Sequence, residues 1–385
     1  MSQSFPSLRE LLAGLIESPS VSAVSPQLDM SNLALIERLA GWAESLGFRC
    51  ELQPTAREGH WNLIATLGSG PGGLVLAGHT DTVPCDPELW SSDPFALQER
   101  DGRLYGLGTC DMKSFLGIAL DVVREFDAGK FSAPLILLAT ADEETGMAGA
   151  RALLDAKKPQ AQFALIGEPT GMRPVRAHKG VFMEGVRVIG HSGHSSNPAL
   201  GASAMEGMHL LIGELLAFRA DLQQRYRNDS FDVPVPTLNL GHIHGGDNPN
   251  RICGQCELSF DLRPLPGMDP AELRRLLRER LGAALDGSAL RVEFLDLFEG
   301  VPPMETAADS PLVTACERLT GYSAESVAFG TEAPYFQRLG MDVVVLGPGD
   351  IAQAHQPDEF LAVQRIEPMR QLLRQLIGRF CLPAG

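Results

Sequence analysis

Five residues of this sequence have the side chains of a metal site and follow segments that could place them together. They are His79, Asp111, Glu144, Glu168 and His355. Imidazole and carboxylate groups are common ligands of zinc and related divalent ions. Two such ions held close together lower the pKa of a bound water and turn it into a nucleophile for hydrolysis. We therefore predict a dinuclear hydrolytic site.

Apolar segments that resemble buried parallel strands precede most of these residues. GGLVLAG runs into His79, PLILLATA into the acidic run 142–144, AQFALIG into Glu168, and DVVVLG precedes the loop that carries His355. Short apolar runs bounded by Gly and Pro fit such strands. In open α/β sheets, ligands bind outside the carboxyl ends of the strands. The five side chains should therefore meet at one edge of a sheet.

Two aspartates have positions that suggest separate tasks. Asp81 lies two residues after His79, so on an extended chain its carboxylate could accept the second ring N–H of that histidine and fix its tautomer. The alternative is an aspartate that caps a turn. Asp111 stands where GLGTCD would need a third glycine to bind a dinucleotide. Because a carboxylate has two oxygens, we expect Asp111 to bridge the two ions.

The acidic run Asp142-Glu143-Glu144 concentrates like charges that repel one another. A solvated helix N-terminus would also tolerate them. Nearby metal would relieve the repulsion, with Glu144 as a ligand and Glu143 left free as the general base. Two divalent ions would be neutralised by Asp111, Glu144, Glu168 and a bridging hydroxide, so a cleft of low dielectric constant could hold them.

A further set of polar residues lies elsewhere in the sequence. In GHSGHSSNP we expect His194 to stabilise a developing oxyanion, although the Ser, Gly and Asn residues around it also suit a turn. Arg263 suits bidentate capture of a substrate carboxylate, with Asn250 as a second candidate. Glu332, in FGTEAPYF, is a candidate contact for a cationic substrate side chain.

The spacing of apolar residues outlines two domains of an α/β protein. Helices are predicted where apolar residues recur three and four apart, at 28–46, 114–127, 201–224, 269–286 and 362–380. Between Glu168 and His355 the pattern is strand, helix, strand, strand, helix, strand, which is the ferredoxin-like order. We therefore predict a catalytic metal-binding domain with a mixed sheet at 1–180 and 294–385, and an inserted α+β domain at 181–293.

The composition excludes several classes of partner. The chain has 385 residues, 44% of them hydrophobic and 21% charged, and a formal net charge of -16. This charge disfavours nucleic acid and anionic membranes and is compatible with a cationic small substrate. No apolar run approaches the roughly 20 residues that cross a bilayer. A cytosolic protein is expected.

The cysteine pattern predicts reduced thiols rather than disulfides or a metal site. The seven cysteines are an odd number, and a chain of this length needs no disulfide framework. Cys253 and Cys256 form a single CxxC in a segment that alternates like a strand. Side chains alternate along a strand, so these two thiols should point to opposite faces and could not easily chelate one ion.

Several motifs together resemble the M20 metallopeptidase family, which includes succinyl-diaminopimelate desuccinylase and aminoacylase. The motifs are AGHTDTVP, GTCDMK, ADEET, IGEPT, RAHKG, SGHSS and AHQPDE, and they extend from about residue 77 to 359. The resemblance implies a larger zinc-peptidase-like catalytic domain and an inserted dimerisation domain, which also acts as a lid. It also implies hydrolysis of the acetyl amide of N2-acetyl-L-ornithine. Another N-acyl amino acid, a succinylated substrate or a dipeptide remains the alternative.

The resemblance also implies a division of labour within the site. His79 and Glu168 would bind one ion, Glu144 and His355 the other, Asp111 would bridge, and Glu143 would shuttle protons. We expect zinc, with cobalt as the alternative, because histidine and carboxylate ligands suit both. The inserted domain would mediate a homodimer and bring His194 toward the partner's site. The peptide bond after Asp111 should be cis.

Overall fold

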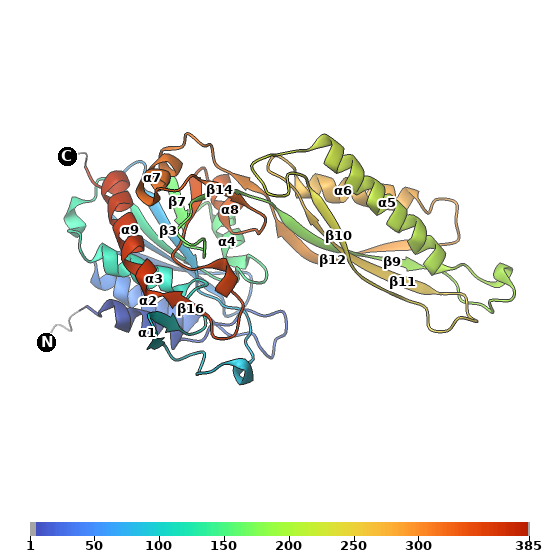
Figure 1. Ribbon diagram of the computed structural model, residues 1–385, viewed down its shortest axis with the longest axis horizontal. Coiled ribbons are helices and arrows are strands. Elements are labelled where there is room, and N and C mark those ends of the chain that lie inside the picture. The colour runs from blue at the N-terminus through green and yellow to red at the C-terminus, as the bar shows by residue number, and fades with distance from the viewer. Residues whose placement is uncertain (1–4, 384–385) are drawn as a thin grey trace. The chain divides into compact units, whose positions relative to one another are not determined.

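The computed structural model describes residues 5–383, so the outermost ends of the predicted catalytic domain lie outside the described residues. The chain separates into two compact units (Figure 1). The first comprises Met1–Arg176, Thr306–Glu325 and Glu332–Gly385, and the second comprises Ala177–Glu305 and Ser326–Thr331. The chain thus leaves the first unit, forms most of the second, and returns.

A mixed sheet forms the centre of the first unit. Its order is β1 (Arg49–Pro54), β2 (Trp61–Leu67), β6 (Leu135–Thr140), β3 (Leu74–His79), β7 (Phe163–Ile166), β15 (Asp342–Val345), β8 (Val175–His178) and β13 (Met304–Glu305), with β14 (Glu325–Val327) paired to β8. The strands β6, β3, β7 and β15 are parallel to one another. These are the four apolar segments that precede His79, the acidic run 142–144, Glu168 and the loop of His355, and their carboxyl ends share one edge.

Helices cover the sheet of the first unit. Every residue of β3, β6 and β7 is buried, so both faces of the sheet are covered. The helices of this unit are α1 (Leu8–Ile16), α2 (Leu33–Ser45), α3 (Lys113–Val123), α4 (Ala148–Ala156), α7 (Pro311–Thr320), α8 (Ala333–Arg338) and α9 (Ile366–Cys381). Residues of α1, α2, α3, α7 and α9 share one hydrophobic core with the sheet. A small sheet of β16 (Phe360–Ala362), β5 (Arg103–Tyr105) and β4 (Gln98–Arg100) lies in the same unit.

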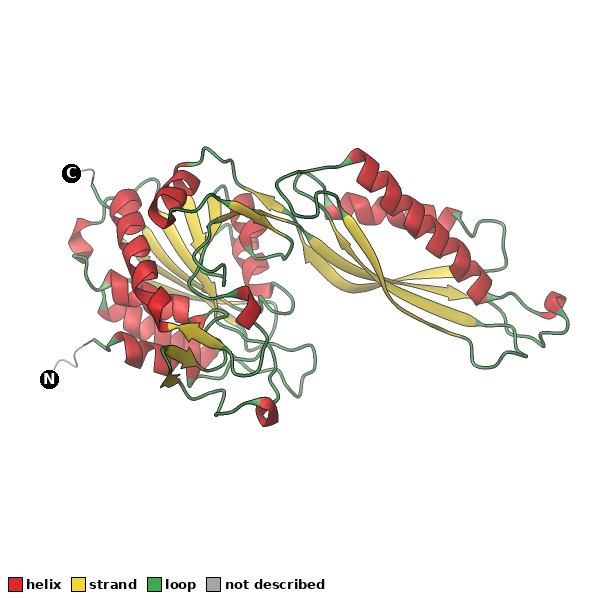
Figure 2. Cartoon of the chain, in the orientation of Figure 1, coloured by secondary structure: helices red, strands yellow, loops and turns green. Residues whose placement is uncertain are grey.

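The second unit has the predicted ferredoxin-like order. Its strands are β9 (Val181–Ile189), β10 (Thr237–Gly245), β11 (Gln255–Arg263) and β12 (Arg291–Val301), in the antiparallel order β10-β11-β9-β12. The helices α5 (Ala204–Arg225) and α6 (Pro270–Ala283) lie on one face of this sheet (Figure 2). Their leucines pack with the inward side chains of the strands in a second hydrophobic core.

The cysteines are free thiols, but one detail of the CxxC prediction was wrong. Strand β11 begins at Gln255, so Cys253 precedes the strand and does not follow its alternation. Both Cys253 and Cys256 are buried in the same hydrophobic core.

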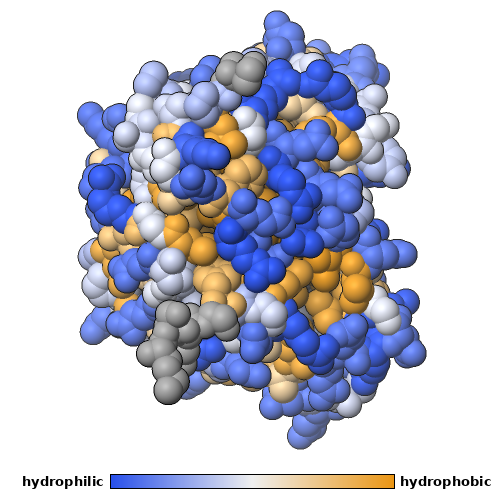
Figure 3. All heavy atoms as spheres, turned by 90° about the vertical axis from the view of Figure 1, so that its left-hand side faces the viewer, coloured by the Kyte–Doolittle hydropathy of each residue, from blue (hydrophilic) through white to orange (hydrophobic). Residues whose placement is uncertain are grey.

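Among the described residues, no helix is both long enough and apolar enough to cross a bilayer. Figure 3 shows one face of the molecule, where hydrophilic residues surround patches of hydrophobic ones.

Candidate metal centre

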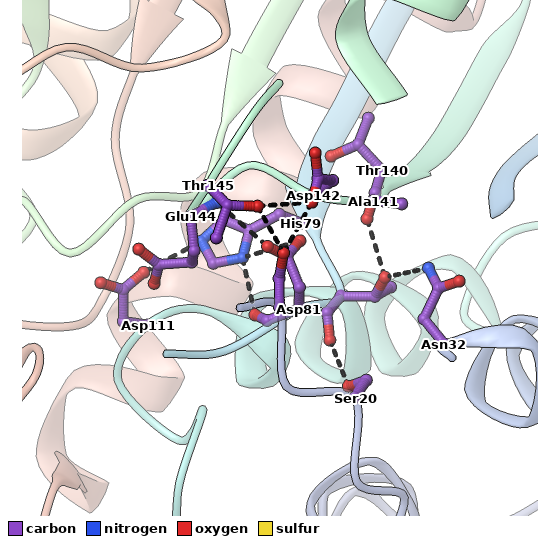
Figure 4. Close-up of polar contacts among 12 residues, drawn as sticks. Ser20, Asn32, His79, Asp81, Asp111, Thr140, Ala141, Asp142, Glu144 and Thr145 are labelled. Atoms are coloured by element: carbon purple, nitrogen blue, oxygen red, sulfur yellow. Dashed lines mark hydrogen bonds and ion pairs between the residues drawn. The ribbon is translucent and has the colours of Figure 1, made fainter. Parts of the chain in front are cut away.

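His79 and Asp111 form the buried half of a cluster at the carboxyl edge of the parallel strands. His79 is the last residue of β3, and Asp111 lies two residues before α3. The Nε2 atom of His79 is 3.0 Å from Oδ1 of Asp111 and 3.9 Å from Oε1 of Glu168. Figure 4 shows His79, Asp111 and Glu144 converging on one another. The peptide bond between Asp111 and Met112 is cis, as expected.

His355 and Glu144 form the second half. The Nε2 atom of His355 is 3.1 Å from the carboxylate of Glu144 and 3.7 Å from Oδ2 of Asp111. The two oxygens of Asp111 therefore face different histidines, Oδ1 toward His79 and Oδ2 toward His355. This is the arrangement that a bridging carboxylate needs.

The distances within the cluster fit divalent ions. Two ligand atoms that each lie about 2.0–2.1 Å from one tetrahedral zinc are separated by about 3.3 Å. The four distances from histidine nitrogens to carboxylate oxygens, 3.0, 3.1, 3.7 and 3.9 Å, surround that value. The ligand atoms of His79, Glu143 and Glu168 also lie within 4.8 Å of one another, as do those of His79, Asp111 and Glu144.

The electrostatics of the cluster also favour bound cations. Burial, with the charge of Glu168 as the next contribution, raises the pKa of Glu143 well above its usual value. Burial likewise raises the pKa of Glu168 well above its usual value, and it raises that of Glu144, where the charge of Asp111 adds to it. The Oε1 atom of Glu168 is buried without a hydrogen-bond partner. Because uncompensated buried carboxylates are costly, cations at this position would stabilise their ionised forms.

The first acid of the run 142–144 has a different task from the next two. Asp142 has a φ of 64°, a left-handed conformation that Asp tolerates better than most residues. Its carboxylate accepts a hydrogen bond from the Ser22 hydroxyl at 2.7 Å and pairs with Arg57. Asp142 therefore anchors the acidic turn, while Glu143 and Glu144 belong to the metal cluster.

The predicted contact between the Asp81 carboxylate and His79 is wrong in detail. The Nδ1–H of His79 donates to the backbone carbonyl of Asp81 at 2.9 Å, whereas the nearest carboxylate oxygen is 3.8 Å away. The carboxylate instead accepts the backbone N–H of Glu144 through Oδ2 at 3.0 Å. At Asp81 the backbone carbonyl thus lies closer to the His79 ring than the carboxylate does. Asp81 still directs Nε2 of His79 into the cluster.

The remaining predicted residues do not belong to this cluster. His194, Asn250 and Arg263 lie in the second unit. Nδ1 of His194 is 2.8 Å from the Ser196 hydroxyl, and Nε of Arg263 donates to Asp261 at 3.0 Å. Their predicted roles in catalysis and substrate binding stay predictions.

Glu332 is a buried acid in the first unit. The residue is 1% exposed, and burial raises its pKa to about 7, with the charges of His79 and Asp81 acting in opposite directions. Its predicted contact with a cationic substrate side chain stays a prediction.

Two residues of the site were missed by the sequence reasoning. Glu359 accepts backbone N–H groups from the loop that carries Asp111, and Lys113 is a completely buried cation whose Nζ donates to the carbonyl of Ser18 at 3.0 Å. Both lie inside the motifs AHQPDE and GTCDMK. These motifs were recognised, but contacts with backbone groups leave no pattern in a single sequence, so neither residue was assigned a role.

The chain is similar to named proteins over nearly its whole length. The chain is 50% identical over 384 residues to an acetylornithine deacetylase of Edwardsiella ictaluri (strain 93-146), covering 99% of this chain and 100% of that protein. It is 48% identical over 383 residues to an acetylornithine deacetylase of Photorhabdus laumondii, covering 99% of both.

Solved structures share the fold at low sequence identity. An M20 family metallo-carboxypeptidase of Sulfolobus solfataricus gives a TM-score of 0.76 at 19% identity, covering 97% of this chain and 98% of that one. A dinuclear metal-binding M20 peptidase of Bacillus subtilis gives 0.66 at 15% identity, covering 96% of both. Residues 75–379 match the family described as Peptidase family M20/M25/M40. Since this match spans most of the chain and the relatives are about half identical over their full length, the chain belongs to the M20/M25/M40 peptidase family.

Proposed function

We propose that this protein hydrolyses the acetyl amide of N2-acetyl-L-ornithine to L-ornithine and acetate. The observation that carries the proposal is one acid, Glu143, beside a set of five residues suited to holding two ions. Relatives named acetylornithine deacetylase match the chain over nearly its whole length at about half identity, which supports this substrate.

The cluster suits two divalent ions, with zinc as the resident metal and cobalt as the alternative. His79 and Glu168 would hold one ion, Glu144 and His355 the other, and Asp111 both. Such a pair supplies a water molecule of lowered pKa and polarises the acetyl carbonyl.

The residues of the chain then have to move one proton. Glu143 takes a proton from the attacking water as the new C–O bond forms. It returns the proton to the amine nitrogen as the C–N bond breaks, and the acetic acid that forms gives its proton to the released amine, so that acetate and the ammonium form of the product leave. The high pKa that burial gives this carboxyl favours holding the proton between the two steps.

Substrate binding involves the second unit in this proposal. Arg263 and Asn250 would bind the substrate carboxylate, and His194 would donate to the oxyanion of the tetrahedral intermediate. Because Arg263 is paired with Asp261, the substrate would compete with that aspartate or add to the pair.

We also propose a cytoplasmic homodimer formed through the second unit. Strand β10 is an edge of its sheet, and its Ile243 is 55% exposed. On the adjacent helix α5, Met205 and Leu216 are 50% and 38% exposed and lie about three turns apart, hence on one side. Exposed apolar side chains beside an unpaired strand edge are typical of a surface that a second chain covers.

The test is a comparison of kcat/KM for N2-acetyl-L-ornithine, N-succinyl-diaminopimelate and a dipeptide, with elemental analysis of protein purified without added metal. We expect the acetylated substrate to be preferred by at least about 100-fold, because a pocket that pairs polar groups rejects substrates lacking them. Preference for the dipeptide or the succinylated substrate would move the protein to another activity of the family. Protein that contains no metal and is insensitive to chelators would refute the mechanism.

A further inference from the structure

A single buried carboxylate holds the loop that leads into Asp111. Oε1 of Glu359 accepts the backbone N–H groups of Cys110 at 2.7 Å, Asp111 at 3.0 Å and Gly108 at 3.1 Å. Its other oxygen lies 3.1 Å from the same Gly108 nitrogen. Glu359 is 1% exposed, so these bonds form away from water, where charge-assisted hydrogen bonds are strong.

The backbone on both sides of this contact is also tied together. Strand β16, which begins one residue after Glu359, pairs with β5 so that Phe360 faces Tyr105. The carbonyl of Glu359 accepts the N–H of Gly106 at 3.1 Å. His355 lies only four residues before Glu359. One short segment of chain thus carries a histidine of the metal cluster and also grips the loop of the bridging aspartate.

The loop has little freedom to compensate if this grip is lost. Gly108 has a φ of 85°, and a Cβ placed there would lie 3.0 Å from Cδ of the buried Lys113. The loop therefore packs closely against the Lys113 side chain and is also hydrogen-bonded to Glu359. A shift of the loop moves Asp111 directly, because Asp111 is the last of the residues that donate to Glu359.

We infer that Glu359 is a positioning residue that sets the orientation of the Asp111 carboxylate between the two ion positions. The hydrogen bonds that its carboxylate accepts come from backbone N–H groups, so we assign it an action through Asp111 rather than on the substrate. The inference rests on the proposed metal-dependent function. Loss of a hydrogen bond that orients a metal ligand typically lowers metal affinity by about 10- to 100-fold.

The test compares zinc binding to metal-free wild-type protein, Glu359→Gln and Glu359→Asp by calorimetric titration. Glutamine keeps the volume and one acceptor, but it removes the charge and turns an N–H₂ group toward the N–H of Gly108. We expect Glu359→Gln to bind zinc about 10- to 100-fold more weakly. Glu359→Asp should show a smaller loss, because it keeps the charge but has a shorter reach.

A second readout needs neither metal nor turnover. Cys110 donates its N–H to Glu359 and is 3% exposed, so its thiol should resist iodoacetamide in the metal-free wild type and react faster in Glu359→Gln. The matched control is Glu184→Gln, since Glu184 is also 1% exposed but binds Arg274 and Arg278 in the second unit. This control should leave zinc affinity and Cys110 labelling unchanged.

The outcomes are distinguishable. Wild-type zinc affinity and a protected Cys110 in both Glu359 variants would overturn the inference while leaving the proposed function intact. If Glu359→Gln does not fold, Glu359→Asp decides the question alone. A wild-type protein that binds neither zinc nor cobalt would instead refute the proposed function.

Discussion

Asp81 and Glu144 are joined by a hydrogen bond in which the backbone N–H of Glu144 donates to Oδ2 of Asp81 at 3.0 Å. The contact links the turn after β3 to the turn after β6, two neighbouring parallel strands. Because the backbone carbonyl of Asp81 already fixes the ring of His79, the carboxylate is available to place Glu144. One residue therefore orients a histidine with its backbone and an acid with its side chain.

This division predicts a selective effect of Asp81→Asn. The substitution leaves the carbonyl contact to His79 unchanged but weakens the hold on Glu144 and removes a negative charge. We expect zinc affinity to fall by about 10- to 100-fold at the position of Glu144 and His355. A double-mutant cycle for zinc binding should show coupling of Asp81→Asn with Glu144→Gln and little coupling with Glu168→Gln.

The control for this experiment is Asp155→Asn, an exposed aspartate on α4 that should not change zinc binding. Coupling with Glu168→Gln alone would mean that the Asp81 carboxylate acts on His79, as the sequence had suggested.

The isosteric substitution Glu143→Gln should separate metal binding from proton transfer. Glutamine cannot accept the proton of the attacking water, and general acid–base catalysis contributes about 10²- to 10⁴-fold. We therefore expect kcat to fall by about that factor while the zinc content stays at the wild-type value. Glu37→Gln, at an exposed position of α2, is the control. Activity near that of the wild type in Glu143→Gln would remove Glu143 from the mechanism.

The stability of the metal-free protein should depend on pH through the same cluster. The folded state raises the pKa of Glu143, Glu144 and Glu168, mainly by burial, and raises the pKa of His355 to about 9, mainly through its hydrogen bond to Glu144. A group whose pKa is higher in the folded than in the unfolded state stabilises the protein at low pH, and this contribution is lost as pH rises. The carboxyl groups and the histidine therefore act in the same direction.

The measurement is the difference in Tm between zinc-loaded and metal-free protein from pH 5 to 9. Groups remote from the cluster contribute equally to both Tm values, so their contributions cancel in the difference. We expect the difference to widen as pH rises, because the metal-free cluster loses its protons and its charges repel, while bound zinc neutralises them. A difference that stays constant or narrows would show that the cluster does not titrate in this way.

The sequence predicted the centre of this site because its local signals agree with the tertiary fold. The strands β3, β6, β7 and β15 are short apolar runs, and parallel strands bring their carboxyl ends to one edge. The residues that follow these strands could therefore be grouped into one site without knowing any side-chain contact. The ferredoxin-like order of the second unit was predicted for a similar reason, since apolar residues recur at helical or strand spacing along its elements.

Other features depended on contacts that a single sequence does not encode. The choice between backbone and side chain at Asp81 is a matter of about one ångström, and Glu359 recognises backbone N–H groups, which every residue except proline carries. The helix α1 was missed although Ser7 and Glu10 form a capping box, because its apolar residues extend for only nine positions. The helix α8, which begins one residue after Glu332, was likewise not predicted from the sequence.

The proposed dimer leads to a prediction for α5. The double substitution Met205→Glu/Leu216→Glu places two charges on the exposed apolar side of this helix. It should convert the dimer to a monomer in light scattering coupled to gel filtration. Leu276→Glu is the control, since Leu276 is an exposed leucine, 37% accessible, on the neighbouring helix α6. A dimer that survives the double substitution would place the interface elsewhere.

The same dimer makes the origin of His194 testable by complementation. If His194 acts in the partner's site, mixing inactive Glu143→Gln with inactive His194→Ala through unfolding and refolding creates heterodimers with one complete site, which combines Glu143 of one chain with His194 of the other. Random pairing makes half of the dimers mixed, so about a quarter of wild-type activity should return. If His194 acts within its own chain, every site in the mixture lacks one of the two residues and activity stays at the level of the separate variants. A mixture that remains inactive although mass spectrometry detects the heterodimer would therefore exclude sharing of the site.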